Sequence, residues 1–238
     1  GNTTSRNVMW KPEEGQEYEV RLLSFPDNDG QPFKELMFYY NIPGQRGLLA
    51  PSQFGKRDPI QELIDKLRSE GTKESYEMAK KLYPKMRVYA PVVVRGEENQ
   101  GVKFWGFGKT VYQELLSIIA DPDYGDITDP VSGRDVVVEF KTAEETGKSF
   151  PSTNIRVKPN QTPITEDAST METIKDTQKN ITEIYQEQSY DELTSALNEY
   201  LNGSSEEGEE SSESESNENT KTFDAKETSD AFDDLFNS

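Results

Sequence analysis

The chain has 238 residues, and its formal charge of −19 is concentrated in the last third. Residues 1–164 hold 22 basic and 24 acidic side chains, a net charge of −2, whereas residues 165–238 hold 4 and 21, a net charge of −17. Cysteine and histidine are absent, which excludes disulfides, thiolate or imidazole metal sites, and catalysis by Cys, by His or by a Ser-His-Asp triad. We expect one globular domain followed by an acidic region.

The first part of the chain predicts strands. Residues 17–25 alternate apolar and polar side chains with a period of two, which is typical of a half-buried strand. The turn at 26–30 leads to a second strand over 33–42, and residues 47–50 form a short third strand. Because Tyr39 and Tyr40 are adjacent, one ring must face away from the core. Tyr39 is therefore a candidate for stacking on a base, and a half-exposed structural tyrosine is the alternative.

Two helices are expected next, within residues 51–84. Asp58 followed by Pro59 is a helix start, since Asp caps the first turn and Pro lacks an N–H that would go unbonded there. A second helix over 72–83 stops at Pro84. The first of these helices has an apolar stripe at helical spacing, made of Ile60, Leu63, Ile64 and Leu67.

Strand patterns then resume and continue to the end of the neutral region. Residues 85–95 and 101–108 predict a long hairpin, an amphipathic helix capped by Thr110 runs to Ala120, and residues 134–142 and 150–158 predict a last hairpin. Several strands with helix-containing insertions indicate a mainly β, α+β protein built on a small β-barrel.

The central hairpin carries the residues with the most chemical information, because cations and aromatic rings share its two strands. Single-stranded nucleic acid needs both, since rings stack on unpaired bases while Lys and Arg follow the phosphates. Alternation puts Arg87 and Tyr89 on one face, and it also groups Lys103, Trp105 and Phe107. The alternative is that the rings are ordinary core and the cations a solvated rim. The hairpin candidates are Lys85, Arg87, Tyr89, Arg95, Lys103, Trp105, Phe107 and Lys109.

A loop rich in carboxylates offers an enzymatic alternative, a metal-dependent nuclease. Its acidic residues are Asp121, Asp123, Asp126 and Asp129, at the spacing of a calcium loop or a two-metal site. The Asp-x-Asp-x-Asp-Gly order is not met, however, so a solvated acidic loop without a metal is the preferred interpretation.

The composition changes after Pro159. Residues 165–202 predict a polar helical region, with a loosely held helix over 165–188 and a clearer one over 190–201 that Gly203 ends. Residues 203–220 contain no apolar side chain, so we expect a disordered acidic tail over 203–238. The negatively charged tail would compete with DNA phosphates for a cationic groove, and this competition would weaken as the salt concentration rises. The chain ends with aromatic and aliphatic residues among carboxylates, namely Phe232, Asp233, Asp234, Leu235 and Phe236.

That terminal peptide suits docking into a basic, apolar groove of a partner protein, and a merely solubilising tail is the alternative. A protein-interaction adaptor with an inert barrel is accordingly a rival to nucleic-acid binding. It predicts partner binding by the last nine residues and no DNA affinity for residues 1–164.

In order and spacing, several segments resemble the single-stranded DNA-binding (helix-destabilising) proteins of T-even-type bacteriophages. The likeness covers roughly residues 10–163 and rests on the segment 19–33, the strand 89–95 and residues 101–112, in which Phe107-Gly-Lys109 is followed by an amphipathic helix. The acidic last nine residues resemble the C-terminal tip of that family.

The resemblance implies an OB-fold that binds single strands in a positively charged, aromatic-lined cleft, without catalysis and without a cofactor. It also implies that the protein coats strands during phage replication, recombination and repair in the bacterial cytoplasm, self-associates along DNA, and recruits replication proteins through its tail. By position, Tyr89, Trp105 and Phe150 match stacking aromatics of that cleft, and its basic lining is matched by Lys85, Arg87, Arg95 and Lys109.

The chain departs from the family where type members hold a structural zinc through His and Cys. The corresponding residues here contain neither, so we expect a zinc-free member in which the apolar stripe of the first helix replaces the metal. The predicted organisation is an OB-fold core over 1–164 with a helical subdomain at 51–84, a helical linker over 165–202, and the tail over 203–238.

Overall fold

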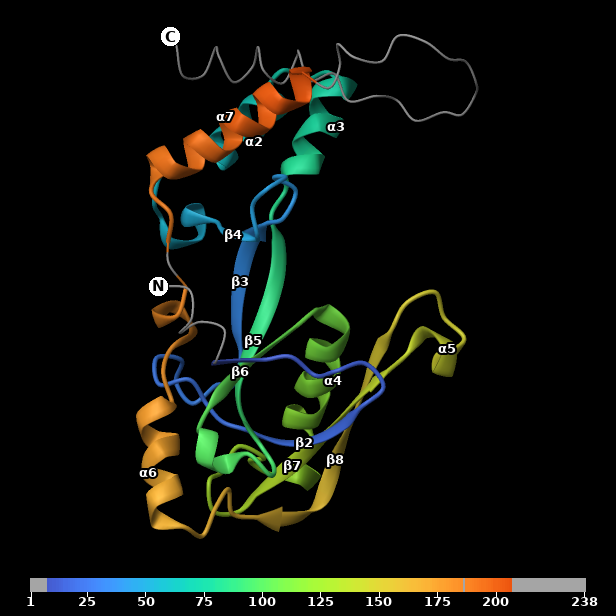
Figure 1. The fold of residues 1–238 in the computed structure, drawn as a ribbon, viewed down its shortest axis with the longest axis vertical. Helices are drawn as coiled ribbons and strands as arrows, with labels where there is room; N and C mark the ends of the chain where they lie inside the picture. The colour runs from blue at the N-terminus through green and yellow to red at the C-terminus, as the bar shows by residue number, and fades with distance from the viewer. Residues whose placement is uncertain (1–7, 186, 207–238) are drawn as a thin grey trace. The chain divides into compact units, whose positions relative to one another are not determined.

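A computed structural model describes residues 8–185 and 187–206 as a mixed α+β protein with a large open β-sheet (Figure 1). The chain divides into two compact units. Unit 1 comprises the described parts of residues 1–36 and 86–186, and unit 2 those of residues 37–85 and 187–238. Within the described ranges, no helix is both long and apolar enough to cross a bilayer.

The sheet of unit 1 is antiparallel except at one edge, where β1 and β6 run parallel. Along the described chain, β8 is hydrogen-bonded to β7 alone, so the sheet stays open and the predicted five-stranded OB-fold barrel is not confirmed. In spatial order the strands are β1 (Met9–Trp10), β6 (Lys103–Phe107), β5 (Lys85–Val94), β2 (Glu17–Leu22), β7 (Gly133–Lys141) and β8 (Ser152–Thr162).

Three helices of unit 1 connect or follow these strands. Helix α4 (Lys109–Ala120) lies between β6 and β7 in the chain, and α5 (Ala143–Thr146) lies in the β7–β8 connection. Helix α6 (Ala168–Thr177) follows β8. The N-cap of α4 is Gly108, with no side-chain cap, so the prediction that Thr110 caps this helix is wrong.

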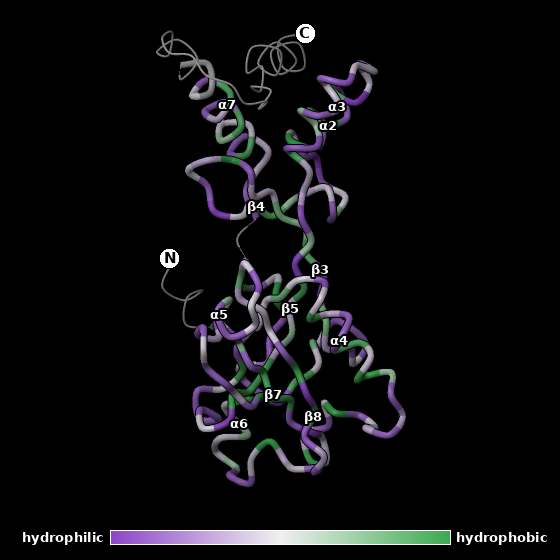
Figure 2. The backbone as a smooth tube through the Cα atoms, turned by 90° about the vertical axis from the view of Figure 1, so that its right-hand side faces the viewer, coloured by the Kyte–Doolittle hydropathy of each residue, from purple (hydrophilic) through white to green (hydrophobic). Residues whose placement is uncertain are grey.

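The core of unit 1 fills the space between the sheet and α4. Val88, Ala90 and Val92 of β5 point into it, together with apolar residues of β2 and β7 and with Leu115 of α4. Strand β7 contains three consecutive valines, Val136 to Val138, and Figure 2 shows apolar colouring on the strands of this unit. Branched aliphatic side chains on alternate strand positions form this face, as the period of two predicts.

Unit 2 is a small helical body attached to a short strand pair. In it, β3 (Lys34–Tyr39) pairs antiparallel with β4 (Leu48–Leu49), followed by the 3₁₀ turn η1 (Pro51–Phe54). The boundary between the units falls inside β3, between Leu36 and Met37. Its helices are α2 (Pro59–Ser69), α3 (Lys73–Leu82) and α7 (Tyr190–Glu206).

The helices of unit 2 share one apolar core, and α7 is part of it. The predicted stripe of α2 is fully buried there, with Ala79 and Leu82 of α3 and with Leu193 and Leu197 of α7. Helix α7 continues through Gly203 to Glu206, so the prediction that Gly203 ends it is wrong. The region 165–202, predicted as one linker, is instead divided between unit 1 and unit 2.

Asp58 caps α2 as the sequence predicts. One of its carboxylate oxygens accepts hydrogen bonds from the backbone N–H groups of Ile60 (3.0 Å) and Gln61 (3.1 Å). The other accepts from the hydroxyls of Tyr39 (2.7 Å) and Ser52 (2.9 Å). A single buried carboxylate therefore joins β3, η1 and the start of α2.

Candidate nucleic-acid interface

The rings predicted on one face of β6 lie in the core of unit 1. Trp105 is 2% exposed and Phe107 is 4% exposed, and their rings are 4.7 Å apart. The cause is the strand register, which sets Ala90 opposite Trp105 and Val88 opposite Phe107. Directly opposed residues of an antiparallel pair share a face. These two candidate rings are therefore not exposed to stack on bases, and the alternative interpretation, ordinary core, holds for them.

Tyr39 is also unavailable for stacking in this conformation. Its side chain is 2% exposed within the core of unit 2, and its hydroxyl donates to Asp58. Burial, and then the hydrogen bond to this carboxylate, raise the pKa of Tyr39 above its ordinary value. The alternative of a structural tyrosine is the better description, although the ring is buried rather than half-exposed.

The opposite face of the hairpin holds the remaining aromatic candidate, Tyr89. It lies across from Gly106 of β6, and a Cβ atom on that glycine would come within 2.7 Å of the Tyr89 ring. The ring therefore extends over the glycine, close to the sheet. Tyr89 is only 5% exposed, and Tyr185 packs against it with ring centroids 5.7 Å apart and an interplanar angle of 63°. The hydroxyl of Tyr185 donates to that of Tyr89 at 2.8 Å.

Around this end of the hairpin, three predicted cations form no ion pair with an acidic residue of the described ranges. Arg87 precedes Tyr89 on the same face, half-buried, while Lys109 follows β6 and is exposed. Because Val88 pairs with Phe107, the register brings Arg87 and Lys109 to the same end of the hairpin. Lys85, exposed at the start of β5, likewise forms no ion pair with any residue in 8–185 or 187–206. Lys103 differs, since its ammonium lies 3.8 Å from Glu97.

Arg95 lies in a buried ion network and does not line a cleft. Its guanidinium contacts both carboxylate oxygens of Asp135, at 3.0 and 3.1 Å, and donates to the backbone carbonyls of Pro163 and Ile164. Arg21, fully buried, contacts Asp135 at 3.1 Å. These partners of Arg95 hold the fold together, so the prediction of a phosphate contact by this residue is wrong for this conformation.

The electrostatics of this network are asymmetric, with two guanidinium groups for one carboxylate. Burial lowers the pKa of the Arg21 guanidinium, and the positive charge of Arg95 lowers it further, while Asp135 opposes both. The other two guanidinium nitrogens of Arg21 donate to the backbone carbonyl of Asp129 and to the carbonyl and hydroxyl oxygens of Thr162. The network thus anchors the chain that follows β8 to the sheet.

Phe150 is the one predicted ring that the structure leaves open to solvent within the described ranges. It is 67% exposed and lies in the β7–β8 connection, beside the exposed Lys148. A capping box between Thr142 and Glu145 orders α5 at the start of this connection, and Gly147 turns the chain with a φ of 68°. The loop thus presents an aromatic ring and a cation on an ordered turn.

The acidic loop uses its carboxylates to hold turns. Asp121 accepts a hydrogen bond from the Asp123 N–H, Asp126 from Thr128, and Asp129 from Val131 and Ser132. The last two bonds lower the pKa of Asp129. Among the residues described, no three acidic side chains are placed to hold a metal ion. The carboxylates of this loop thus act as local caps of its turns.

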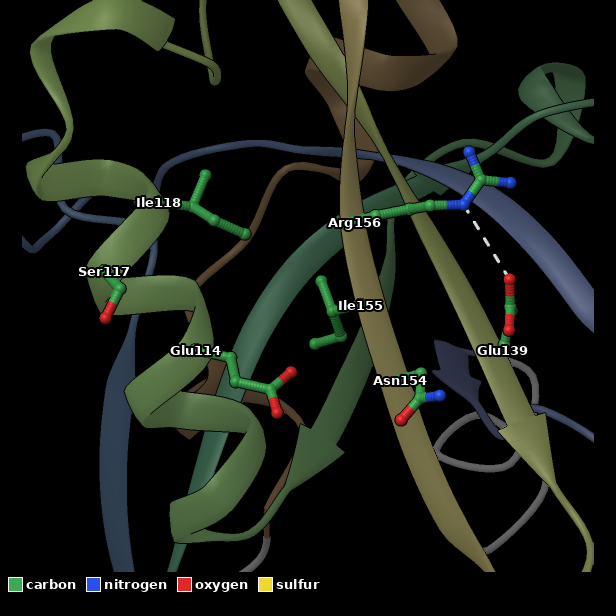
Figure 3. Close-up of a pocket in the computed structure, with 7 residues that line it drawn as sticks. All are labelled: Glu114, Ser117, Ile118, Glu139, Asn154, Ile155 and Arg156. Carbon is green, nitrogen blue, oxygen red and sulfur yellow. Dashed lines mark ion pairs between the residues drawn. The ribbon is translucent and has the colours of Figure 1, made fainter. Parts of the chain in front are cut away.

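A pocket of about 510 Å³ lies between α4 and β8 (Figure 3). Glu114, Ser117 and Ile118 of α4 form one wall, and Ile155 and Arg156 of β8 lie on the other. Arg156 pairs across the sheet with Glu139 at 3.7 Å. The pocket contains none of the predicted binding residues.

No protein-family model and no curated protein matches the chain. The resemblance to T-even phage proteins therefore stays a prediction, and so do the phage origin and the host location. The terminal motif Phe232 to Phe236 lies outside the described residues, together with the rest of the predicted tail from residue 207.

Sequence reasoning missed the residues that cover and anchor the hairpin. Tyr185 lies in a polar segment, and no spacing rule relates it to Tyr89, 96 positions earlier. Arg21 offered a weak signal, since a charged residue lies between Val20 and Leu22 in an apolar strand. Such a residue needs a buried partner, but its identity cannot be derived from local pattern.

Proposed function

We propose that this chain binds single-stranded DNA without sequence preference, through the outer face of the β5–β6 hairpin and the β7–β8 loop. The observation that carries the proposal is the strand order β6-β5-β2-β7-β8 with α4 placed between β6 and β7. With β3 and β4 left out, the strands β2, β5, β6, β7 and β8 are numbered one to five in chain order. The first then pairs with the second and fourth, the second with the third, and the fourth with the fifth. This strand order supports a partly open OB-fold.

The chemistry at the expected positions supports the same proposal. OB-folds bind oligonucleotides on the face of strands two and three and on the loop between strands four and five. Here those positions hold Arg87 and Tyr89 of β5, Lys109 after β6, and Phe150 in the β7–β8 loop. Unpaired cations beside rings suit a strand whose bases stack and whose phosphates are neutralised.

The wider role follows from the family resemblance and is part of the proposal. A protein of this kind coats and protects single strands during phage DNA replication, recombination and repair. Its acidic tail recruits replication proteins and competes with DNA for the cationic surface, an electrostatic effect that salt weakens. Self-association along the strand belongs to the same role.

The first test measures binding of a fluorescein-labelled oligo-dT by anisotropy, because buried Trp105 is a poor reporter of a ligand. We expect saturable binding that weakens with salt. Replacing both Arg87 and Lys109 by Ala should reduce the slope of log affinity against log salt by about 1.4, since each lost phosphate contact removes about 0.7. Lys158→Ala is the control, because Lys158 is already paired with Glu19 at 2.8 Å. No binding in 50 mM salt would contradict the proposed function.

The second test concerns the exposed ring. Phe150→Ala should weaken oligo-dT binding by roughly 5- to 150-fold, the equivalent of one lost stacking contact of about 1–3 kcal/mol. Phe150→Tyr keeps a flat ring and should retain most of the affinity. Thermal unfolding should be unchanged in both variants, since the side chain is largely exposed. Equal binding by the Ala variant and the parent chain would exclude this loop from the interface.

A further inference from the structure

Residues 165–185, here called the strap, lie along the outer face of the unit 1 sheet. Ile174 of α6 packs in a small apolar cluster with Leu23, Val93 and Val102, on the face opposite the main core. The hydroxyl oxygen of Thr177 accepts a hydrogen bond from the backbone N–H of Val102 at 2.8 Å. In Figure 1, α6 and the chain after it run beside the sheet. The strap is therefore packed, whereas the sequence predicts a loosely held helix.

Further contacts guide the strap toward the end of the hairpin that carries Tyr89. The side-chain amide of Gln178 donates to the Ser24 carbonyl at 2.7 Å, and Asn180 accepts from the Asp27 N–H at 3.1 Å. Ile181 is 1% exposed. The last contact is that of Tyr185 with Tyr89.

This last contact occupies the position where a base would stack. Tyr89 extends over Gly106, and Arg87 reaches the same spot, since its guanidinium would lie 3.4 Å from a Cβ on that glycine. A flat ring, a small residue beneath it and a cation beside it form a site suited to a nucleotide. The strap itself carries five acidic and two basic side chains, a net charge of −3.

We propose that Tyr185 occupies a nucleobase-stacking site on Tyr89, and that a single strand binds there by displacing the end of the strap. The proposal rests on the proposed function and names the regulation of that same site. It differs from competition by the acidic tail, because the contact between the two rings is uncharged. The competition should therefore persist in high salt, where the competition by the tail fades.

The test compares oligo-dT affinity of the full-length chain and its Tyr185→Ala variant. The variant should bind about tenfold more tightly, because an aromatic pair and a hydrogen bond no longer need to be broken. Its salt slope should equal that of the parent chain, since no charge changes. Tyr185→Phe, which loses only the hydroxyl, should bind about threefold more tightly. Thr182→Ala is the control, because Thr182 is an exposed residue of the strap, and this variant should bind oligo-dT with the affinity of the parent chain.

Hydrogen exchange of the parent chain gives a second readout that needs no variant. Adding oligo-dT should accelerate amide exchange over residues 178–185 and slow it in β5. Unchanged or slower exchange in the strap, or equal affinity of the parent and Tyr185→Ala chains, would overturn the inference while leaving the proposed function intact. Absence of binding by the parent and all variants would instead reject the proposed function, and the inference with it.

Discussion

Replacing Asp135 by Asn should lower the free energy of unfolding by about 3–5 kcal/mol, since it leaves two buried or half-buried guanidinium groups without their carboxylate. Arg21 and Arg95 both contact Asp135 at about 3 Å, and the Arg21 side chain is fully buried. An amide keeps the shape of the carboxylate and removes its charge. Urea unfolding followed by circular dichroism measures the change.

Asp123→Asn is the matched control, because Asp123 is exposed in the acidic loop and forms no ion pair with a described residue. Its stability should stay within about 0.5 kcal/mol of that of the parent chain. If Asp135→Asn lowered the free energy of unfolding as little as Asp123→Asn does, the ion network of Asp135 would not be the interaction that fixes the chain after β8 to the sheet.

Leu197→Ala should lower the stability of unit 2 by about 2–5 kcal/mol, the usual effect of truncating a fully buried leucine. Leu197 is 0% exposed and packs with the apolar residues of α2 and α3. We therefore expect faster amide exchange in α2 and α3, although the substitution lies more than a hundred residues later in the chain. Hydrogen exchange resolved by segment measures this effect.

Ser195→Ala provides the comparison for this variant, since Ser195 lies on the exposed face of the same helix. It should leave exchange in α2 and α3 unchanged. If amide exchange in the Leu197→Ala chain accelerated only in α7, then α2 and α3 would be stable without α7. That result would contradict a core shared by the three helices.

The β5–β6 hairpin shows which features the alternation of side chains predicts and which it does not. Alternation correctly grouped Arg87 with Tyr89, and Trp105 with Phe107, because side-chain direction along a strand depends only on local backbone geometry. Which group faces the core depends on the partner strands. The register with Val88 and Ala90 decides it, and that register is a long-range property.

Arg95 illustrates the same limit for charged residues. As a sequence feature it is a cation at the end of an aromatic-rich strand, which is consistent with a phosphate contact. The structure brings Asp135 to it from 40 positions away and adds carbonyl oxygens from residues 163 and 164. Nothing in local composition distinguishes a cation that meets such partners from one that meets solvent.

The sequence by itself determined the elements whose signals are local. These include the Asp58 cap and apolar stripe of α2, the two hairpins, and the absence of thiol and imidazole chemistry. Only the tertiary structure decided that the sheet stays open, that Trp105 is core, and that residues 165–206 are shared between two units. The physical reason is that burial and pairing are set by contacts between residues distant in the chain, which no periodicity encodes.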